Sequence, residues 1–496
     1  MNTAQQPTSE FNTKQIFLFL ALYFTIHLVV RIFISDSAEL DEAEQLLLTQ
    51  DLRLGYGSQP PLYTWLLSGL FSFFDNKILA LALLKNSLLF LSYLLVFLSA
   101  KEVTRDKNRA VIAMLSLLLI PQIFWESQRD LTHSVLGTTI AAGTLFVMVR
   151  LLKTGRPYYY AVFGLCAGAG LISKYNYGIF LVALFLAGCT IKTLRPRLLH
   201  RNMLLSILCL LLVASPHLYW AITNMQATLS QAGKFKVGRS LGLWASYSLG
   251  FRKLMMAIVS FLGLLLPIFA LFFYKPEVRN IAASTEDDYA VLIRRTLGTG
   301  LVLCILMVLL FKITVFKDRW MQPLLFATPI YLVTLPWMRF NPVNVLRYAN
   351  FALFIALAVL LIMPGHILYS SHTGTLSRLN SPYAALSTQL RKADFQGGLI
   401  IAQGRLLGGN LKLFFPESVI VAPEVPAFTA PSDTDRLIVW DATNNAEMPE
   451  GLHKFAGTLS SVDLNTLPAQ YIQSPYSYVA DRSMRLGFLL IRKGTP

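Results

Sequence analysis

Long apolar runs fill the first 370 residues of the chain, and short polar connections separate them. A helix needs about 20 predominantly apolar residues to cross the hydrocarbon core of a bilayer. The pattern therefore predicts about 11 membrane-spanning helices, at residues 15–34, 78–100, 109–124, 131–151, 157–173, 177–191, 202–222, 251–274, 295–315, 321–337 and 347–369. The apolar run Pro60–Phe74 is shorter, and we expect it to form a helix that lies in the outer membrane–water interface.

The apolar runs shorten to strand length after residue 369. Gly, Pro and Asn separate four of them, GGLIIAQ, ESVIVA, RLIVWDAT and LGFLLIRK. Runs this short between turn signals are typical of β-strands. The sequence thus predicts an all-α transmembrane domain over residues 1–369, whose first loop covers 35–77. A small soluble α/β domain over 370–496 follows it.

Composition agrees with a membrane protein. Hydrophobic residues make up 54 % of the chain and charged residues only 14 %, against roughly 25 % charged in soluble domains. Mean hydropathy is +0.53. No small-residue cleavage site follows the first apolar run, so we expect Ile16–Ile34 to be retained as a signal anchor. Four cysteines lie inside apolar runs without C-x-x-C spacing, which favours core positions over disulfides or metal ligands: Cys166, Cys189, Cys209 and Cys304.

The net charge of +16 lies mostly in loops between apolar runs. This is the usual membrane pattern and argues against nucleic-acid binding. Lys and Arg concentrate in alternate loops, at residues 101–109, 150–156, 192–201 and 275–295. Cytoplasmic loops carry an excess of these residues, so we expect the N-terminus in the cytoplasm. With an odd number of spans, loop 35–77 and the C-terminal domain then lie outside, on the opposite side of the membrane.

Candidate chemistry begins in the loop after the first span, which carries Glu39, Asp41, Glu42 and Glu44. Carboxylates this close to hydrocarbon can act as bases or hold a metal ion. They can equally cap the next helix, because acidic residues favour a helix's first turn. Asp130 presents a similar choice, between a functional acid and the N-cap of a helix that begins at Leu131.

Several cations lie on the same predicted side. Lys85 falls inside the second span, Lys174 lies in SKYNYG, and Lys317 and Arg319 lie in VFKDRWMQP. An ionisable residue within a span is costly and is a functional candidate. Arg beside Trp suits phosphate and sugar contacts; snorkelling to the interface is the alternative for each cation. The sequence has no H-E-x-x-H, no P-loop and no G-x-S-x-G, which argues against a zinc hydrolase, an ATP-driven pump and a serine hydrolase.

A series of short motifs resembles one family. They are Asp41-Glu42-Ala43, the run from Gly55 to Leu66, Asp130, Ser173-Lys174-Tyr175, Pro216 to Trp220 and Asp318 to Pro323. Because these motifs occur in this order, the chain resembles the polyprenyl-phosphate-sugar-dependent membrane glycosyltransferases of the GT-C fold. Their superfamily contains protein O-mannosyltransferases and lipid A aminoarabinose transferases, and the nearest likeness is to bacterial galacturonosyltransferases of lipopolysaccharide. The likeness covers about residues 15–365.

The resemblance implies roles for individual residues. It implies that Asp41 is the catalytic base or activates the acceptor, with Glu42 and Asp130 beside it in catalysis. It implies that Tyr56 and the residue before Pro-Pro grip the donor phosphate; many relatives have Lys or His there, whereas this chain has Gln59. That departure shifts weight to Lys85, Arg252, Lys317 and Arg319. The further donor-binding candidates are Arg129, Lys174 and Trp320. A divalent metal ion at Asp41, Glu42 and Asp130 is permitted but not required.

The implied function is an inverting hexosyl or pentosyl transfer from a polyprenyl phosphate to a periplasmic acceptor. The acceptor is lipopolysaccharide, lipid A or another lipid-linked glycan, and the lipid phosphate is its own leaving group, so no nucleotide or other cofactor is required. One alternative is a protein O-glycosyltransferase. Another is a flippase of lipid-linked sugars, which predicts inverted repeats and carboxylates in mid-span, whereas the carboxylates here cluster near a span's end.

Overall fold

The computed structural model describes residues 12–57, 59–226, 242–275, 287–425, 428, 434–460 and 462–494. The chain divides into two compact units. The first consists of Met1–Thr25, Ser58–Leu62 and Lys85–Val359, and the second of Ile26–Gly57, Tyr63–Leu84 and Leu360–Pro496. The acidic residues after the first helix therefore belong to the same unit as the C-terminal residues. The predicted domain boundary between residues 369 and 370 stays a prediction.

Long apolar helices define the first part of the chain. Among the residues that the structure describes, six helices are long and apolar enough to cross a membrane, α1 (Thr13–Ile34), α4 (Lys77–Thr104), α7 (Thr132–Thr154), α11 (Met203–Thr223), α15 (Asp288–Phe311) and α18 (Pro342–Leu368). Two bent pairs raise this number to as many as eight: Lys107–Leu119 with Gln122–Arg129, bent by 73°, and α13 (Leu243–Leu262) with α14 (Leu265–Phe273), bent by 48°. The chain is a multi-pass membrane protein as predicted, but the count of 11 spans is not confirmed.

Several predicted spans are shorter or interrupted. The first bent pair contains α5 (Lys107–Leu115), η1 (Ser116–Leu119), the π-helical turn η2 (Gln122–Glu126) and α6 (Ser127–Arg129). Shorter helices are α3 (Leu62–Phe71), α8 (Pro157–Leu171), α9 (Tyr177–Cys189) and α10 (Arg195–Leu198). The predicted span 321–337 is wrong. This region holds two short helices, α16 (Gln322–Leu325) and α17 (Thr328–Leu332), and the short helix η5 (Asp318–Trp320) precedes them. Pro323 and Pro329 are each the second residue of a short helix, because proline is tolerated in a helix's first turn but cannot continue a helix from the residues before it.

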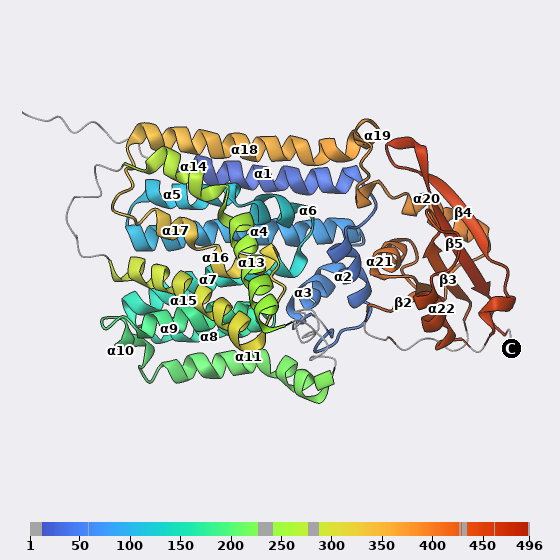
Figure 1. Ribbon diagram of the computed structural model, residues 1–496, viewed down its shortest axis with the longest axis horizontal. Helices are drawn as coiled ribbons and strands as arrows, with labels where there is room; N and C mark the ends of the chain where they lie inside the picture. The colour runs from blue at the N-terminus through green and yellow to red at the C-terminus, as the bar shows by residue number, and fades with distance from the viewer. Residues whose placement is uncertain are drawn as a thin grey trace, which may run out of the picture. The chain divides into compact units, whose positions relative to one another are not determined.

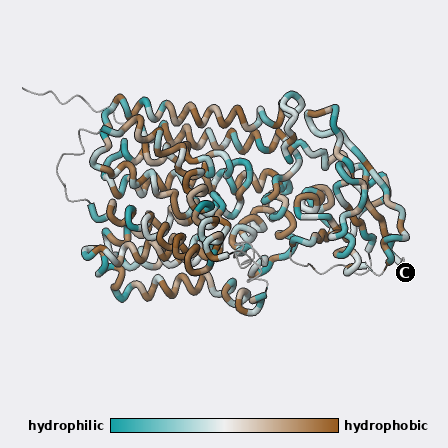
Figure 2. The backbone as a smooth tube through the Cα atoms, in the orientation of Figure 1, coloured by the Kyte–Doolittle hydropathy of each residue, from teal (hydrophilic) through white to brown (hydrophobic). Residues whose placement is uncertain are grey.

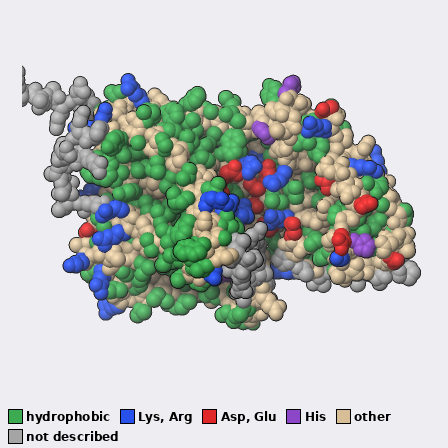
Figure 3. Space-filling model, viewed as in Figure 1, with side chains coloured by type: hydrophobic (Ala, Val, Ile, Leu, Met, Phe, Trp, Pro, Cys, Tyr) green, Lys and Arg blue, Asp and Glu red, His purple; other side chains and the backbone are tan. Residues whose placement is uncertain are grey.

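Within the first unit, α8 packs between α7 and α11, and α9 packs against α15 (Figure 1). These helices are apolar along most of their length and polar at their connections (Figure 2). On the face drawn in Figure 3, hydrophobic side chains cover their flank, and Lys and Arg gather at the end where α10 lies. Leu204, Leu208 and Leu212 of α11 are exposed. An apolar flank with charged ends suits a lipid environment.

The C-terminal part of the second unit is a five-stranded sheet of order β2-β1-β3-β5-β4. Its strands are β1 (Leu399–Ala402), β2 (Val419–Val421), β3 (Arg436–Asp441), β4 (Gln470–Tyr476) and β5 (Val479–Ile491). β1 pairs in parallel with β2 and β3, whereas β5 pairs antiparallel with β3 and β4. The four predicted strand runs are confirmed. β4 was missed, because its mostly exposed polar residues and Pro475 mark it only as an edge strand.

Alternation along the strands gives this sheet two apolar faces. Ile400 and Ala402 of β1 join one core cluster, and Leu399 and Ile401 join the other. The first face is covered by α20 (Tyr383–Lys392) and α21 (Arg405–Phe414), and the second by α22 (Glu450–Gly457). Short helices complete the unit: α19 (Ser370–Thr373), η6 (Arg378–Asn380) and η7 (Leu464–Thr466). The predicted α/β fold is thus present.

Candidate active site

The acidic residues after α1 form one short helix, α2 (Leu40–Leu48). Glu39 is its N-cap residue, and Glu42 Oε2 accepts the Glu39 backbone N–H at 3.1 Å. The expected capping role of these acidic residues is therefore present. Asp41 lies in the first turn and is half-buried.

Arginines hold the three glutamates of this segment. Arg31 donates to Glu42 at 2.8 Å, Arg378 to Glu39 at 3.1 Å, and Arg405 to Glu44 at 2.8 Å. All three glutamate side chains are buried, and a buried carboxylate needs a charged or hydrogen-bonding partner to stay ionised. We infer that the glutamates anchor α2; the candidate base that the family resemblance implies is Asp41, which is half-buried in the first turn of that helix. A catalytic role for Glu42 stays a prediction.

The Tyr56 hydroxyl forms hydrogen bonds with the backbone of its own loop. It donates to the Asp51 carbonyl at 2.9 Å and accepts the Arg53 N–H at 3.0 Å. Burial raises the pKa of this hydroxyl, and the ring belongs to the core on the first face of the sheet. These contacts close the turn that precedes Pro60. The predicted grip of Tyr56 on a phosphate is untested, as is that of the partly buried Gln59.

A second polar cluster lies in the first unit, around the start of α7. Lys85 of α4 is only 3 % exposed and donates to the Gln128 carbonyl at 3.5 Å. The Gln128 side-chain amide donates to Asn86 at 3.2 Å. Arg129, next along α6, pairs with Glu126 at 2.6 Å and is partly exposed. A buried ammonium in a helix of a multi-pass protein favours function over snorkelling for Lys85.

Lys174 reaches the same cluster from the turn between α8 and α9. Its ammonium donates to the Ser134 hydroxyl of α7 and to the Arg319 carbonyl at 3.3 Å. Asn176 donates to the Trp320 carbonyl at 2.7 Å. The turn SKYNYG and the segment at η5 are therefore in contact. Both segments had been singled out in the sequence because they carry cations.

The backbone beside Asp130 is irregular. α7 begins at Thr132 and its N-cap residue is Leu131, in the left-handed conformation with φ +63° and without a side-chain cap. The N-cap alternative for Asp130 is therefore wrong. Asp130 is buried and follows the π-helical turn η2 by a few residues. Left-handed non-glycine residues and π-helical turns recur at functional sites.

Asp318 joins the two bent pairs of helices to this cluster. Gln122 of η2 donates to Asp318 at 3.0 Å, and Ser260 of α13 donates to the same carboxylate oxygen at 3.4 Å. Trp320 lies edge-on to Phe316 and is partly buried, as is Arg319. Lys317 and Arg252 are exposed. Lys174 and its turn thus contact the backbone of Arg319 and Trp320, and Lys85 contacts Gln128 just before α7. Within the described part of the chain, no hydrogen bond or ion pair joins Arg252 to these residues.

An aromatic stack in the same unit was not predicted from the sequence. The His217 ring lies between Tyr175 and Trp220, with centroid distances of 5.9 Å and 5.7 Å and nearly parallel planes. The Tyr175 hydroxyl lies 3.2 Å from His217 Nε2. The run Pro216 to Trp220 was noted only as a motif, and its spacing of three places His217 and Trp220 on one helical face. Such a stack can pack against the C–H face of a sugar.

Comparisons with known proteins decide the family. Residues 58–220 match the model of the dolichyl-phosphate-mannose-protein mannosyltransferases. Over 495 residues the chain is 34 % identical to the lipopolysaccharide core galacturonosyltransferase RgtB of Rhizobium johnstonii, covering 96 % of this chain and 97 % of that protein. The chain belongs to the GT-C membrane glycosyltransferases.

Two further similarities agree with this family. The glycosyltransferase is 31 % identical to the core galacturonosyltransferase RgtA of the same organism, over 96 % of this chain and 97 % of that one. Its fold is similar to the crystal structure of ArnT from Cupriavidus metallidurans bound to undecaprenyl phosphate. That match has a TM-score of 0.61 at 13 % identity and covers 96 % of this chain and 98 % of ArnT. The predicted GT-C fold and the prediction of a glycosyltransferase are confirmed.

The sequence permits a metal ion at Asp41, Glu42 and Asp130 of this glycosyltransferase, and the contacts of Glu42 bear on that site. Within the described parts of the chain, no group of three or more His, Cys, Asp or Glu side chains is arranged to hold a metal ion. Glu42 uses one carboxylate oxygen for both Arg31 and the Glu39 N–H. Cationic and N–H partners compete with a metal for that oxygen. A divalent metal ion at Asp41, Glu42 and Asp130 stays a prediction.

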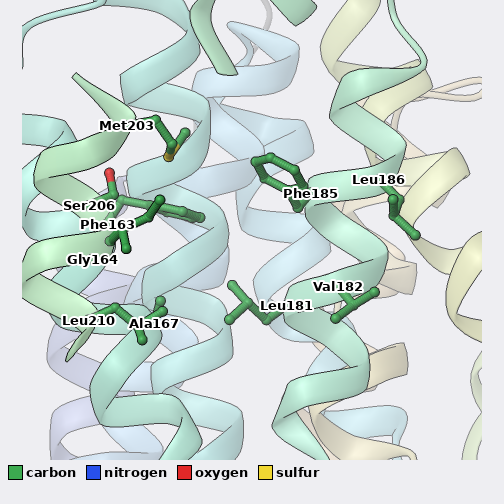
Figure 4. Close-up of a pocket in the computed structure, with 11 residues that line it drawn as sticks. Phe163, Gly164, Ala167, Leu181, Val182, Phe185, Leu186, Met203, Ser206 and Leu210 are labelled. Carbon is green, nitrogen blue, oxygen red and sulfur yellow. The ribbon is translucent and has the colours of Figure 1, made fainter. Parts of the chain in front are cut away.

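An apolar groove of the glycosyltransferase lies between α8, α9 and α11 (Figure 4). Its volume is about 290 Å³, and Phe163 and Phe185 face it from opposite sides. The Ser206 hydroxyl donates to the Tyr160 carbonyl at 2.7 Å. None of the described residues that line the groove is charged, so it suits a hydrocarbon chain and not a phosphate or a carboxylate.

Proposed function

We propose that this glycosyltransferase moves one uronic acid, galacturonic acid, from a polyprenyl phosphate to lipopolysaccharide in the periplasm. The main observation that supports this proposal is the 34 % identity to a lipopolysaccharide core galacturonosyltransferase over nearly the full length of both chains. The similarity to RgtA supports the same sugar and acceptor. ArnT, which has the same fold, was crystallised with undecaprenyl phosphate, and we extend that donor class to this chain as part of the proposal.

In the proposed reaction Asp41 is the base. The oxygen of an acceptor hydroxyl forms a bond to the anomeric carbon of the sugar while its proton passes to the Asp41 carboxylate. The bond between the anomeric carbon and the phosphate oxygen breaks, and polyprenyl phosphate leaves with the electron pair. Attack opposite the leaving group inverts the anomeric configuration in one step, with no nucleotide or other cofactor.

The departing phosphate gains negative charge, and we assign its stabilisation to Lys85, Lys174 and Arg319. Preorganised cations are most effective in a site from which water is excluded. Lys85 is buried, and Lys174 lies beside the backbone of Arg319. The other predicted participants stay predictions: Glu42 and Asp130 in catalysis, and Tyr56, Gln59, Arg129, Arg252, Lys317 and Trp320 at the donor.

The proposal includes an orientation in the inner membrane. Basic residues surround α10 and the ends of α4 and α7, including Lys101, Lys153 and Arg195. By the positive-inside rule this end faces the cytoplasm. The start of α7, with the Lys85 and Lys174 cluster, then faces the periplasm, and the N-terminus is cytoplasmic.

Mass spectrometry of lipopolysaccharide tests the proposal. We would compare cells that carry the wild type, Asp41→Asn, Asp36→Asn or no copy of the gene. Asp36 is an exposed acid of the same loop and serves as the matched control. We expect the uronic-acid mass to disappear from lipopolysaccharide without the gene and with Asp41→Asn, and to remain with Asp36→Asn. Wild-type modification by Asp41→Asn would refute the base assignment.

A protein O-glycosyltransferase is the second candidate, because the matching family model is named for protein mannosyltransferases. The same four strains separate the two. Loss of a hexose from periplasmic proteins, with lipopolysaccharide unchanged, would favour the protein acceptor and overturn the lipid one.

A further inference from the structure

The first turn of α2 is tied to α21 by one buried side chain. Asn410 is fully buried; its Oδ1 accepts the Ala38 N–H at 2.7 Å, and its Nδ2 donates to the Ala38 carbonyl at 3.2 Å. Both polar backbone groups of Ala38 are therefore satisfied by a residue of the C-terminal α/β fold. The entry to α2 is fixed two residues before the helix begins.

The middle of α2 lies directly on α21, and the two helices are side by side in Figure 1. A Cβ atom at Gly409 would lie 2.1 Å from the Ala43 carbonyl oxygen, and one at Gly408 would lie 3.4 Å from a Leu47 methyl carbon. Only residues without a side chain allow two backbones to approach this closely. Gly409 therefore sets the distance between the helices, while the Gly408 position makes an ordinary van der Waals contact with Leu47.

The end of α2 is joined to the sheet. The Gln50 amide pairs with the backbone of Ile420 on edge strand β2, accepting its N–H at 2.8 Å and donating to its carbonyl at 2.9 Å. Leu47 and Leu48 belong to the core on the first face of the sheet. One helix near the start of the chain thus completes the core of a fold made by its last residues.

Arg405 supplies the charge in this contact. Its guanidinium donates to Glu44 at 2.8 Å and lies 3.6 Å from Glu424. Burial acts to lower the pKa of Arg405, but the carboxylates of Glu44, Asp41 and Glu424 outweigh it and raise the pKa. Arg405 therefore interacts electrostatically with Asp41 as well as with the glutamate one turn further along α2.

We infer that the C-terminal α/β fold positions the Asp41 helix, and that Arg405 is the positioning residue of this contact. This inference rests on the proposed function, because it concerns the orientation of the proposed base. The contacts at Ala38, Ala43 and Gln50 hold the backbone of α2 before, within and after the helix. Asp41 therefore has little freedom to rotate or shift. A displacement of about 1 Å at a reacting group can cost about 100-fold in rate.

Arg405→Gln, Arg405→Lys and Arg492→Gln test the inference in the purified full-length protein. Arg492 is the matched control, because it also contacts two carboxylates, Asp394 and Asp435, but all three residues lie outside α2 and α21. We would measure kcat and both KM values for sugar transfer, and hydrogen–deuterium exchange of the peptide that covers α2. Asp41→Asn is measured in parallel.

For Arg405→Gln we expect kcat to fall by about 10- to 100-fold while both KM values stay within about threefold. The α2 peptide should exchange faster, and Arg405→Lys should recover part of kcat because it restores the positive charge. Arg492→Gln should change neither kcat nor the exchange of α2. If Arg405→Gln does not fold, Glu44→Gln removes the same ion pair from its other side.

The inference is overturned if Arg405→Gln keeps wild-type kcat, or if its α2 peptide exchanges at the wild-type rate. It is also overturned if only the acceptor KM rises, which would assign acceptor binding to this fold, or if Arg492→Gln has the same effects. Full activity of Asp41→Asn would instead refute the proposed base, and the exchange rates of α2 would still decide whether Arg405 holds the helix.

Discussion

The Arg31–Glu42 ion pair allows the stabilising role of an α2 carboxylate to be separated from a chemical one. Glu42→Gln keeps the size of the side chain and an oxygen that can accept from Arg31 and from the Glu39 N–H, but it removes the charge. The side chains of Arg31 and Glu42 are 13 % and 1 % exposed. Leaving one partner of a buried pair without its counter-charge costs about 3–5 kcal/mol.

Two contacts reduce this cost. Arg31 also donates to the carbonyls of Ser35 and Ser37, at 3.1 Å and 2.7 Å, so its charge keeps hydrogen-bond partners in the variant. We therefore expect Glu42→Gln to lower the free energy of unfolding by about 2–3 kcal/mol. At roughly 2–4 °C per kcal/mol for a unit of this size, the unfolding midpoint should fall by about 4–12 °C.

Thermal unfolding of the purified, detergent-solubilised chain measures this fall, with sugar transfer by the folded protein assayed below the midpoint. Glu450→Gln is the control, because Glu450 forms an exposed pair with Lys454 and should change stability by less than about 0.5 kcal/mol. An unchanged midpoint for Glu42→Gln would refute the reasoning from burial. A normal midpoint with loss of transfer would show that Glu42 takes part in the reaction.

Three further outcomes follow from the structure. Gly487→Ala should destabilise the C-terminal sheet by about 1–3 kcal/mol in a denaturant titration, because its Cβ would lie 2.3 Å from the Trp440 indole on the neighbouring strand; an unchanged titration midpoint would contradict this. Lys174→Met should lower kcat by about 100-fold or more, measured against Lys454→Met, whose exposed side chain lies in α22; equal rates would remove Lys174 from the phosphate site. The Lys493 backbone N–H, followed by Arg492, lowers the pKa of Asp435, so its ionised form contributes stability above the unfolded value of about 3.9 and that contribution is lost as pH falls through the folded pKa. Asp435→Asn should therefore lower the unfolding midpoint at pH 7, and the difference from wild type should shrink below about pH 4; a difference independent of pH would exclude this cause.

Local pattern was sufficient for much of the fold. Apolar length predicted the multi-pass class and the positions of α1, α4, α7 and α18, because the bilayer imposes a minimum length that is read directly from the sequence. The same pattern failed at 321–337, where Pro323 and Pro329 divide an apolar run into short helices. Hydropathy counts apolar residues and does not register a missing backbone donor.

The candidate site was predicted only in part. Asp41 and its acidic neighbours were identified as candidates, and Lys174 and the Arg319 segment were grouped by chemistry. The stack at His217 and the left-handed Leu131 beside Asp130 were not. Tyr175 comes from the turn between α8 and α9, whereas His217 and Trp220 come from α11, so the full stack forms only in the tertiary structure. Backbone strain at a leucine has no local sequence signal.

The sequence by itself determined that this chain is a multi-pass membrane protein with an acidic segment after its first helix and an α/β fold at its end. Only the tertiary structure decided that the two belong together. Arg405 and Glu44 are separated by 361 positions, and their ion pair depends on the close approach of Gly409 to Ala43. Hydrophobic periodicity is a local property set by the helix or strand repeat, whereas the partner of a buried charge is set by which surfaces pack together.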